Sequence, residues 1–198
     1  MTSILPEHIA TPPESGVPIA AEHGAPDDRR ADVALEQLYD EHYLRLVRLG
    51  VLLLGDAGRA EEVVQDAFVA FYRRLRRPGA GDAVTNAPAY LRQTVVNRSR
   101  SVLRHLKVVA RHPAGSPTDS PGADEHLLHG VRRRQVIDAL ARLPRRQREV
   151  LVLRHYLDLS EREIAETLRI STGAVKSHAS RGAAALRRNL SQLLEENA

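Results

Sequence analysis

The sequence predicts an all-α protein made of two small helical domains that a flexible linker joins. Apolar residues recur at steps of three and four through most of the chain, which is the period of an amphipathic helix. No stretch shows the strict alternation that is typical of a half-buried strand. Residues 110–126 contain three prolines and two glycines, a composition typical of a flexible linker and therefore of a domain boundary.

Composition restricts the classes of function. A chain of 198 residues is long enough for one large or two small domains. It contains no cysteine, which excludes disulfides, zinc fingers and thiol chemistry. The N-terminus lacks the pattern of a signal peptide, and the longest apolar run, residues 51–54, is far too short to span a bilayer. We therefore expect a soluble, cytoplasmic protein.

Charge is distributed unevenly along the chain. Residues 1–30 hold five acidic side chains against two arginines, together with five prolines and little apolar periodicity. This composition predicts a disordered acidic N-terminal tail. Residues 131–198 hold fourteen lysines and arginines against eight acidic residues. A basic C-terminal third indicates a polyanionic partner, although solvated basic surfaces are also common.

We predict three helices in the N-terminal domain, residues 31–109. The first follows a stripe of apolar residues from Leu35 to Leu53, and glycines then mark its end. The second extends from about Ala57 to Leu75. The third begins at Pro88, because a proline in the first turn of a helix sacrifices no hydrogen bond. The linker at 110–126 then leads to the second domain.

The C-terminal domain, residues 127–198, is predicted to contain four helices, roughly at 127–142, 145–157, 160–168 and 172–190. Ser160 and Glu163 have the spacing of a capping box at the start of the third of these. A tight turn follows, and Ser171 is placed to cap the last helix. A short helix, a turn of three or four residues and a longer helix form a helix-turn-helix pattern.

The second helix of this pattern carries a polar, basic stripe. Burial of Val175 and Ala179 leaves the opposite side exposed, with Lys176, Ser177, His178, Ser180 and Arg181. A helix fits the DNA major groove, where lysine and arginine read guanine edges and serine contacts bases or phosphates. The alternative is a solvated surface on an ordinary helix pair. Capping, spacing and small residues at Ala165 and Gly173 together favour the helix-turn-helix.

The residues "LPRRQREVLVLRHYLDLSEREIAETLRISTGAVKSHASRGAAALRR" (143–188) resemble region 4 of bacterial sigma factors. The same stretch alone also fits the output domains of response regulators. Upstream, "AEEVVQDAFVAFYRRL" (60–75) and "NAPAYLRQTVVNRSRSVLRH" (86–105) resemble sigma regions 2.1 to 2.4. Two such domains joined by a linker resemble the extracytoplasmic-function (ECF) group, with a three-helix region 2 and a four-helix region 4.

The resemblance implies a dissociable subunit that binds core RNA polymerase, directs it to certain promoters and opens the −10 element. It implies a monomer when free, with promoter DNA and the polymerase as partners, no cofactor and no enzymatic activity of its own. An anti-sigma factor is a common partner in the family, and no residue identifies one here. The chain departs from the family pattern at three positions. Tyr72 stands where the family usually has tryptophan, which affects the packing of the clamp-facing end. His178 stands where arginine is frequent, and Gly182 interrupts the recognition helix, so both affect the promoter preference.

The resemblance also assigns sites. The β′ clamp helices of the polymerase would contact an acidic group on the second helix: Glu61, Glu62, Gln65 and Asp66. The −10 element would contact Asn97, Arg98, Arg100 and Arg104. The −35 element would contact Arg154, Arg162, Thr172, Lys176, Ser177, His178, Ser180 and Arg181. Part of region 4 would receive the β flap.

Three alternatives compete with this interpretation. A stand-alone helix-turn-helix regulator of the response-regulator type is disfavoured because residues 1–110 lack alternating strands and helices. A pure interaction module would have no need of the basic stripe. A metal site at His126 and His129 is disfavoured because both lie at the linker and the chain has no cysteine ligands.

Overall fold

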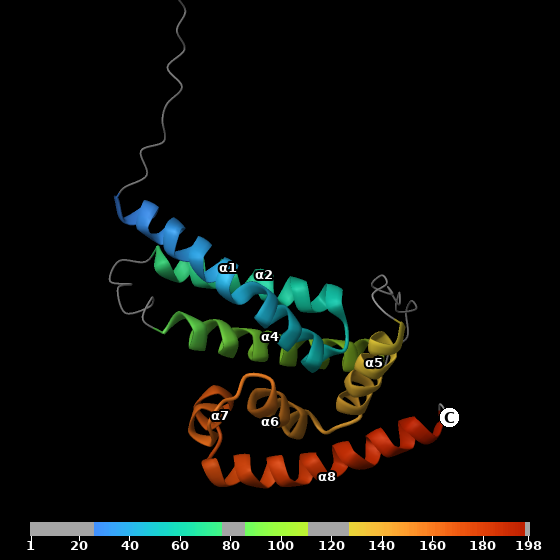
Figure 1. The fold of residues 1–198 in the computed structure, drawn as a ribbon. Coiled ribbons are helices and arrows are strands. Elements are labelled where there is room, and N and C mark those ends of the chain that lie inside the picture. The colour runs from blue at the N-terminus through green and yellow to red at the C-terminus, as the bar shows by residue number, and fades with distance from the viewer. Residues whose placement is uncertain (1–25, 77–85, 111–126, 197–198) are drawn as a thin grey trace, which may run out of the picture.

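The computed structural model describes residues 26–76, 86–110 and 127–196, and the regular structure within these ranges is entirely helical. Figure 1 shows the arrangement of the helices, with α8 on the opposite side of the molecule from α1 and α2. The elements are α1 (Pro26–Leu54), α2 (Ala57–Leu75), α4 (Ala87–Val109), α5 (Leu127–Ala141), α6 (Arg145–His155), α7 (Glu161–Leu168) and α8 (Thr172–Glu196). The prediction of an all-α chain with two helical domains is confirmed.

The helix ends differ from the predictions at a few places. Helix α1 begins at Pro26, so residues 26–30 are helical although the sequence placed them in the tail. Helix α8 continues to Glu196, six residues past its predicted end. Most of the predicted tail, the segment between the second and third predicted helices, and the linker fall at 1–25, 77–85 and 111–126, outside the described residues.

The N-terminal domain consists of α1, α2 and α4, as predicted. Gly55 ends α1 with a φ of +79°, and Asp56 then caps α2 by accepting a 2.8 Å hydrogen bond from the backbone N–H of Arg59. Helices α1 and α2 cross closely at Gly50, where an added Cβ would lie 2.8 Å from the Cβ of Ala60. The largest fully buried apolar side chains of this domain are Leu49, Val64, Phe71, Leu91, Val95 and Val96.

The C-terminal domain consists of α5 to α8, and helices α6 and α8 pack closely at a glycine. Gly182 is buried in α8, and an added Cβ would lie 3.1 Å from the Cδ1 of Leu151 in α6. The sequence indicates that small residues at Ala165 and Gly173 let α7 and α8 approach closely. Ala165 is buried, but Gly173 is exposed and the nearest atom to its added Cβ, the Oγ of Ser171, is 4.0 Å away, so the prediction is wrong for Gly173. Pro144 occupies the N-cap of α6.

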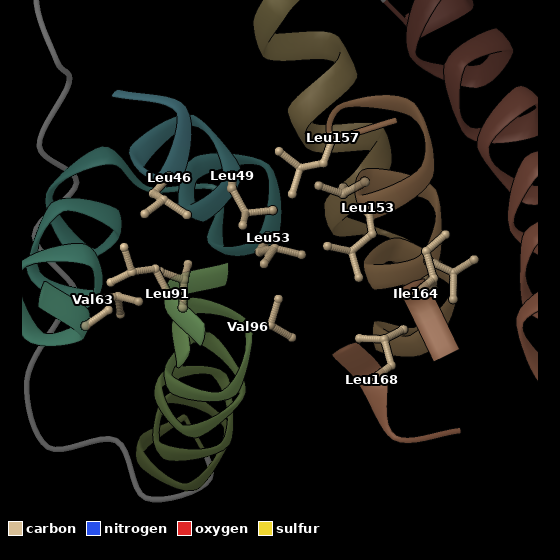
Figure 2. Close-up of a cluster of buried hydrophobic side chains, with 14 of the residues drawn as sticks. Leu46, Leu49, Leu53, Val63, Leu91, Val96, Leu153, Leu157, Ile164 and Leu168 are labelled. Atoms are coloured by element: carbon tan, nitrogen blue, oxygen red, sulfur yellow. The ribbon is translucent and has the colours of Figure 1, made fainter. Parts of the chain in front are cut away.

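The two domains pack against each other rather than standing apart. Helix α1 contacts α5 and α6, and α4 contacts α7. One cluster of buried apolar residues runs through both domains, and Figure 2 shows Leu53 and Val96 on one side of the interface facing Leu153 on the other. Burial of this kind is the main source of stability, at about 25 cal/mol per Å² of apolar surface. The sequence did not predict this contact.

Polar contacts also cross the interface. The guanidinium of Arg148 in α6 donates to the carbonyl of Leu53 in α1 at 2.6 Å, and also to the carbonyls of Ala141 at 2.6 Å and Leu143 at 3.4 Å. Arg148 therefore caps the C-terminal ends of α1 and α5 together, where helices leave carbonyls without partners. Nearby, the hydroxyl of Tyr156 donates to the carbonyl of Arg45 at 3.1 Å.

Candidate nucleic-acid interface

The helix-turn-helix formed by α7 and α8 has the predicted local structure. Ser160 and Glu163 form a complete capping box at the start of α7. Arg169 takes a left-handed conformation, with φ of 54°, at the C-terminal end of α7. The Oγ of Ser171 then accepts from the backbone N–H of Ala174 at 3.2 Å and caps α8. These contacts fix the angle at which α8 leaves the turn.

Four of the five predicted stripe residues of α8 are exposed: Lys176, Ser177, Ser180 and Arg181. Thr172, at the first position of the helix, is also exposed. Opposite them, Val175 and Ala179 are buried, as predicted. The expectation that His178 is exposed is wrong, because the residue is half-buried and its Nδ1 is covered without a hydrogen-bond partner in the described part of the chain. Polar and basic side chains thus define an exposed strip along the start of α8.

Glu161 links the helices around this strip. One carboxylate oxygen of Glu161 accepts from Arg154 in α6 at 3.1 Å, and the other lies 3.7 Å from the Nζ of Lys176 in α8. Arg162 is highly exposed and pairs with Glu166 one turn later in α7, at 3.2 Å. The exposed pair of Arg162 with Glu166 is weak, whereas the pair of Arg154 with Glu161 is partly buried.

Helix α4 carries the residues predicted for the −10 element, and most of them are already bonded. Asn97 is exposed and accepts from Arg100 at 3.0 Å, whereas Arg98 forms an ion pair with Asp66 in α2. The guanidinium of Arg100 also binds Glu149 of the other domain. Arg104 is exposed. The described α4 therefore presents a basic surface that is partly occupied by carboxylates of the same chain.

The acidic group on α2 lies on the exposed side of that helix. Glu61, Glu62, Gln65 and Asp66 are all exposed, on the side opposite the buried Val63 and Ala67.

The sequence did not predict the aromatic cluster beside this acidic group. The rings of Tyr39 and Tyr43 stack at a centroid distance of 4.5 Å, and Phe68 lies 5.1 Å from Tyr39. Burial raises the pKa of the Tyr43 hydroxyl, and the neighbouring Tyr39 and Glu61 add to that effect. The side chain of Tyr39 is 41% exposed, so an accessible aromatic ring lies beside the acidic group.

A groove lies between α2 and α4 on one side and α7 on the other. It is lined by Arg74, Tyr90 and Arg92 on one side and by Glu163 and Glu166 on the other. Burial lowers the pKa of the Arg92 guanidinium, while the charge of Glu163 raises it. The described residues contain no cluster of side chains suited to a metal ion, and the side chains of His126 and His129 lie outside what the structure describes.

Family models match both domains of the chain. Residues 38–108 match sigma-70 region 2, and residues 133–186 match sigma-70 region 4. The ECF RNA polymerase sigma factor SigL of Mycobacterium tuberculosis (strain ATCC 25618 / H37Rv) is 33% identical over 169 residues, which cover 82% of this chain and 93% of SigL. The chain is an ECF sigma factor. The resemblance expected from the sequence is therefore confirmed.

Other relatives agree with this family. The RNA polymerase sigma-E factor of Streptomyces coelicolor is 32% identical to this sigma factor over 160 residues, covering 78% of this chain and 88% of the relative. Two solved complexes share the fold. The chain of the CnrH–CnrY complex matches with a TM-score of 0.55 at 23% identity, over 87% of this chain and 99% of that one. The chain of the complex of RpoE with the anti-sigma factor NepR from Bartonella quintana matches with a TM-score of 0.61 at 20% identity, over 79% and 98%.

Membership of the family decides between the functions that the sequence left open. An ECF sigma factor is a DNA-binding protein of transcription initiation that works with RNA polymerase, and sigma factors are not a class of enzymes. A stand-alone helix-turn-helix regulator is not favoured, because region 2 matches as well as region 4. Among the described helices of this sigma factor, none is long and apolar enough to cross a membrane.

Proposed function

We propose that this sigma factor reads the −35 element with α8 and the −10 element with α4, while α2 binds the β′ clamp helices of core RNA polymerase. In this proposal residues 31–109 act as region 2, 110–126 as the linker and 127–198 as region 4. The observation that carries the proposal is the exposed basic strip on the second helix of a fully capped helix-turn-helix. No chemical step is assigned to the sigma factor itself.

At the −35 element, the exposed side chains of α8 divide into two roles. Lys176 and Arg181 are long enough to reach base edges or phosphates in the major groove, and Ser177 and Ser180 add shorter polar contacts. Thr172 and the start of α8 favour a phosphate, because a helix N-terminus carries partial positive charge. Arg154 and Arg162 on α6 and α7 add phosphate contacts once they leave their carboxylates.

At the −10 element, α4 supplies charge to hold an opened strand. Arg98, Arg100 and Arg104 recur along the C-terminal half of the helix, with Asn97 as a neutral hydrogen-bonding group among them. Contacts of this kind hold the backbone of a single strand without reading its sequence. The residues that capture the unstacked bases are proposed to lie in the loop before α4, which is outside the described residues.

The polymerase contact is proposed for the exposed acidic group of α2. Glu61, Glu62, Gln65 and Asp66 offer negative charge to a basic partner, and oppositely charged surfaces speed association and fix its register. Part of region 4 receives the β flap. Because the complex of RpoE contains the anti-sigma factor NepR, we extend that class of partner to this protein. We place these encounters in the cytoplasm, with a free sigma factor that is monomeric.

Run-off transcription on a pool of genomic promoters tests this proposal. Core RNA polymerase with the sigma factor should start at sites that core polymerase alone does not use. The double variant Lys176→Ala, Arg181→Ala should lose −35-dependent starts. Each lost phosphate contact should reduce the salt slope of promoter binding by about 1. Arg187→Ala is the matched control, since Arg187 is an exposed arginine of α8 farther along the helix. Start sites that do not change when the sigma factor is added would refute the proposal.

A further inference from the structure

Glu149 joins the two domains through the arginine that we assign to the −10 strand. Its carboxylate accepts from the Nε of Arg100 at 2.7 Å and from a terminal nitrogen of the same guanidinium at 2.9 Å. Glu149 lies in α6 of region 4, and Arg100 lies in α4 of region 2. The side chains are 3% and 14% exposed. A two-point pair between an arginine and a carboxylate in such a dry position is one of the stronger polar contacts in proteins.

When the domains separate, Glu149 keeps charged partners and Arg100 does not. Glu149 keeps two partners on its own helix, because it also accepts from Arg146 at 3.0 Å and lies 3.6 Å from Arg145. Separation therefore does not leave the carboxylate without a counter-charge, which is the usual reason that a broken buried ion pair is costly. Within the described residues of α4, Arg100 keeps a side-chain hydrogen bond only to the neutral oxygen of Asn97, at 3.0 Å. The open chain thus offers a guanidinium ready for an anion.

A carboxylate and a phosphate bind a guanidinium in the same two-point geometry. Glu149 consequently occupies Arg100 in the way that a DNA phosphate would. The contact also lies within the interface where Val96 and Leu53 pack against Leu153 and where Arg148 binds the Leu53 carbonyl. Release of Arg100 is therefore coupled to separation of regions 2 and 4.

We propose that Glu149 is an internal substitute for a promoter phosphate, which holds Arg100 and keeps the two DNA-binding regions closed until DNA and polymerase displace it. By reciprocity, whatever closes the domains weakens the DNA contact of Arg100, and DNA bound at Arg100 favours the open form. The inference rests on the proposed contact of Arg100 with the −10 strand, but the closed state can be measured without DNA.

The first experiment measures closure in the full-length protein. Because the chain has no cysteine, Val69→Cys in α2 and Gln192→Cys in α8 provide two exposed sites for a fluorescent donor and acceptor. Glu149→Gln and Arg100→Ala should both lower energy transfer, with the open-to-closed ratio rising about tenfold, within the range for residues in direct contact. Glu195→Gln removes an exposed charge of the same domain and should behave as wild type.

The second experiment measures binding of a short fluorescein-labelled single DNA strand by anisotropy. Glu149→Gln should bind several-fold more tightly than wild type, because it opens the domains and keeps Arg100. Arg100→Ala opens them equally but should gain no affinity. In the Arg100→Ala background, Glu149→Gln should have no further effect. An equal gain in that background would overturn the proposal, because the effect would then not pass through Arg100.

Unchanged energy transfer in Glu149→Gln and Arg100→Ala would also overturn the proposal. Glu149→Gln removes contacts within region 4 as well, so its circular dichroism and melting are compared with wild type. If that variant unfolds, Arg100→Ala still tests closure, since it leaves every contact within region 4 in place. Normal −10-dependent transcription by Arg100→Ala, with reduced energy transfer, would refute the DNA role of Arg100 and leave the closed state standing.

Discussion

Gly50 marks the closest approach of α1 and α2, and its replacement by alanine should destabilise the protein. An added Cβ would lie 2.8 Å from the Cβ and 3.1 Å from the Cα of Ala60. Carbon atoms in good contact lie roughly 3.5–4.0 Å apart, so the helices must separate by roughly 0.7 Å at this point. Both neighbours are rigid, because neither belongs to a side chain that can rotate away.

Two opposing free energies decide the size of the effect. Alanine is better than glycine inside a helix by about 1 kcal/mol. Overpacking of a tight core contact costs about 1–3 kcal/mol. We expect the cost to prevail because the displaced atoms belong to Ala60, whose backbone is part of a buried helix. Gly50→Ala should therefore lower the free energy of unfolding, by up to about 2 kcal/mol.

Gly173→Ala provides the matched control. Gly173 is also helical, but the nearest atom to its added Cβ is 4.0 Å away, so only the gain in helix propensity remains. Urea unfolding followed by far-UV circular dichroism should show a lower midpoint for Gly50→Ala and an unchanged or higher midpoint for Gly173→Ala. If Gly50→Ala is at least as stable as wild type, the close crossing of α1 and α2 is refuted.

Two further predictions concern polar groups. Arg148→Ala should lower the free energy of unfolding by about 3 kcal/mol, measured by urea unfolding, because the buried carbonyl of Leu53 and the partly buried carbonyl of Ala141, both at 2.6 Å, lose a charged donor. Stability within experimental error of wild type would contradict this role. Hydrogen bonds from the Ser160 side chain and backbone hold the pKa of Glu163 below its ordinary value of 4.5. The stabilising contribution of Glu163 is therefore full above that ordinary value and lost as the pH falls through the lower folded-state pKa. Ser160→Ala should then destabilise the protein less in acid than at neutral pH, as measured by urea midpoints, and an equal loss at both would count against the capping box.

Local features of the fold were predictable from the sequence because neighbouring residues determine them. The capping box of Ser160 and Glu163, the cap at Ser171 and the buried face of Val175 and Ala179 depend on spacings of three and four residues. These spacings sufficed to predict the helix-turn-helix. The family resemblance added the expected roles of residues, which physical patterns alone do not supply.

Contacts between distant segments could not be predicted in the same way. Arg100 and Glu149 are 49 residues apart in the sequence, and each is a residue type that is common at exposed positions of a helix. The same holds for Arg148 and the Leu53 carbonyl, which are 95 residues apart. From the sequence, Gly182 is an interruption that weakens α8. In the structure it is a packing contact with Leu151 of another helix, which the sequence alone does not reveal. His178 was misplaced because a helical period alone does not fix the edge of a buried face.

The apolar cluster that runs through both domains has a consequence for the free sigma factor in water. Leu53, Val96 and Leu153 meet across the interface. Separation of the domains would therefore expose leucine and valine side chains to water when it releases Arg100 and Arg148. A bare surface of this kind invites self-association. The open form is therefore stable only when a binding partner covers those side chains. A variant whose domains are open should aggregate as its concentration rises.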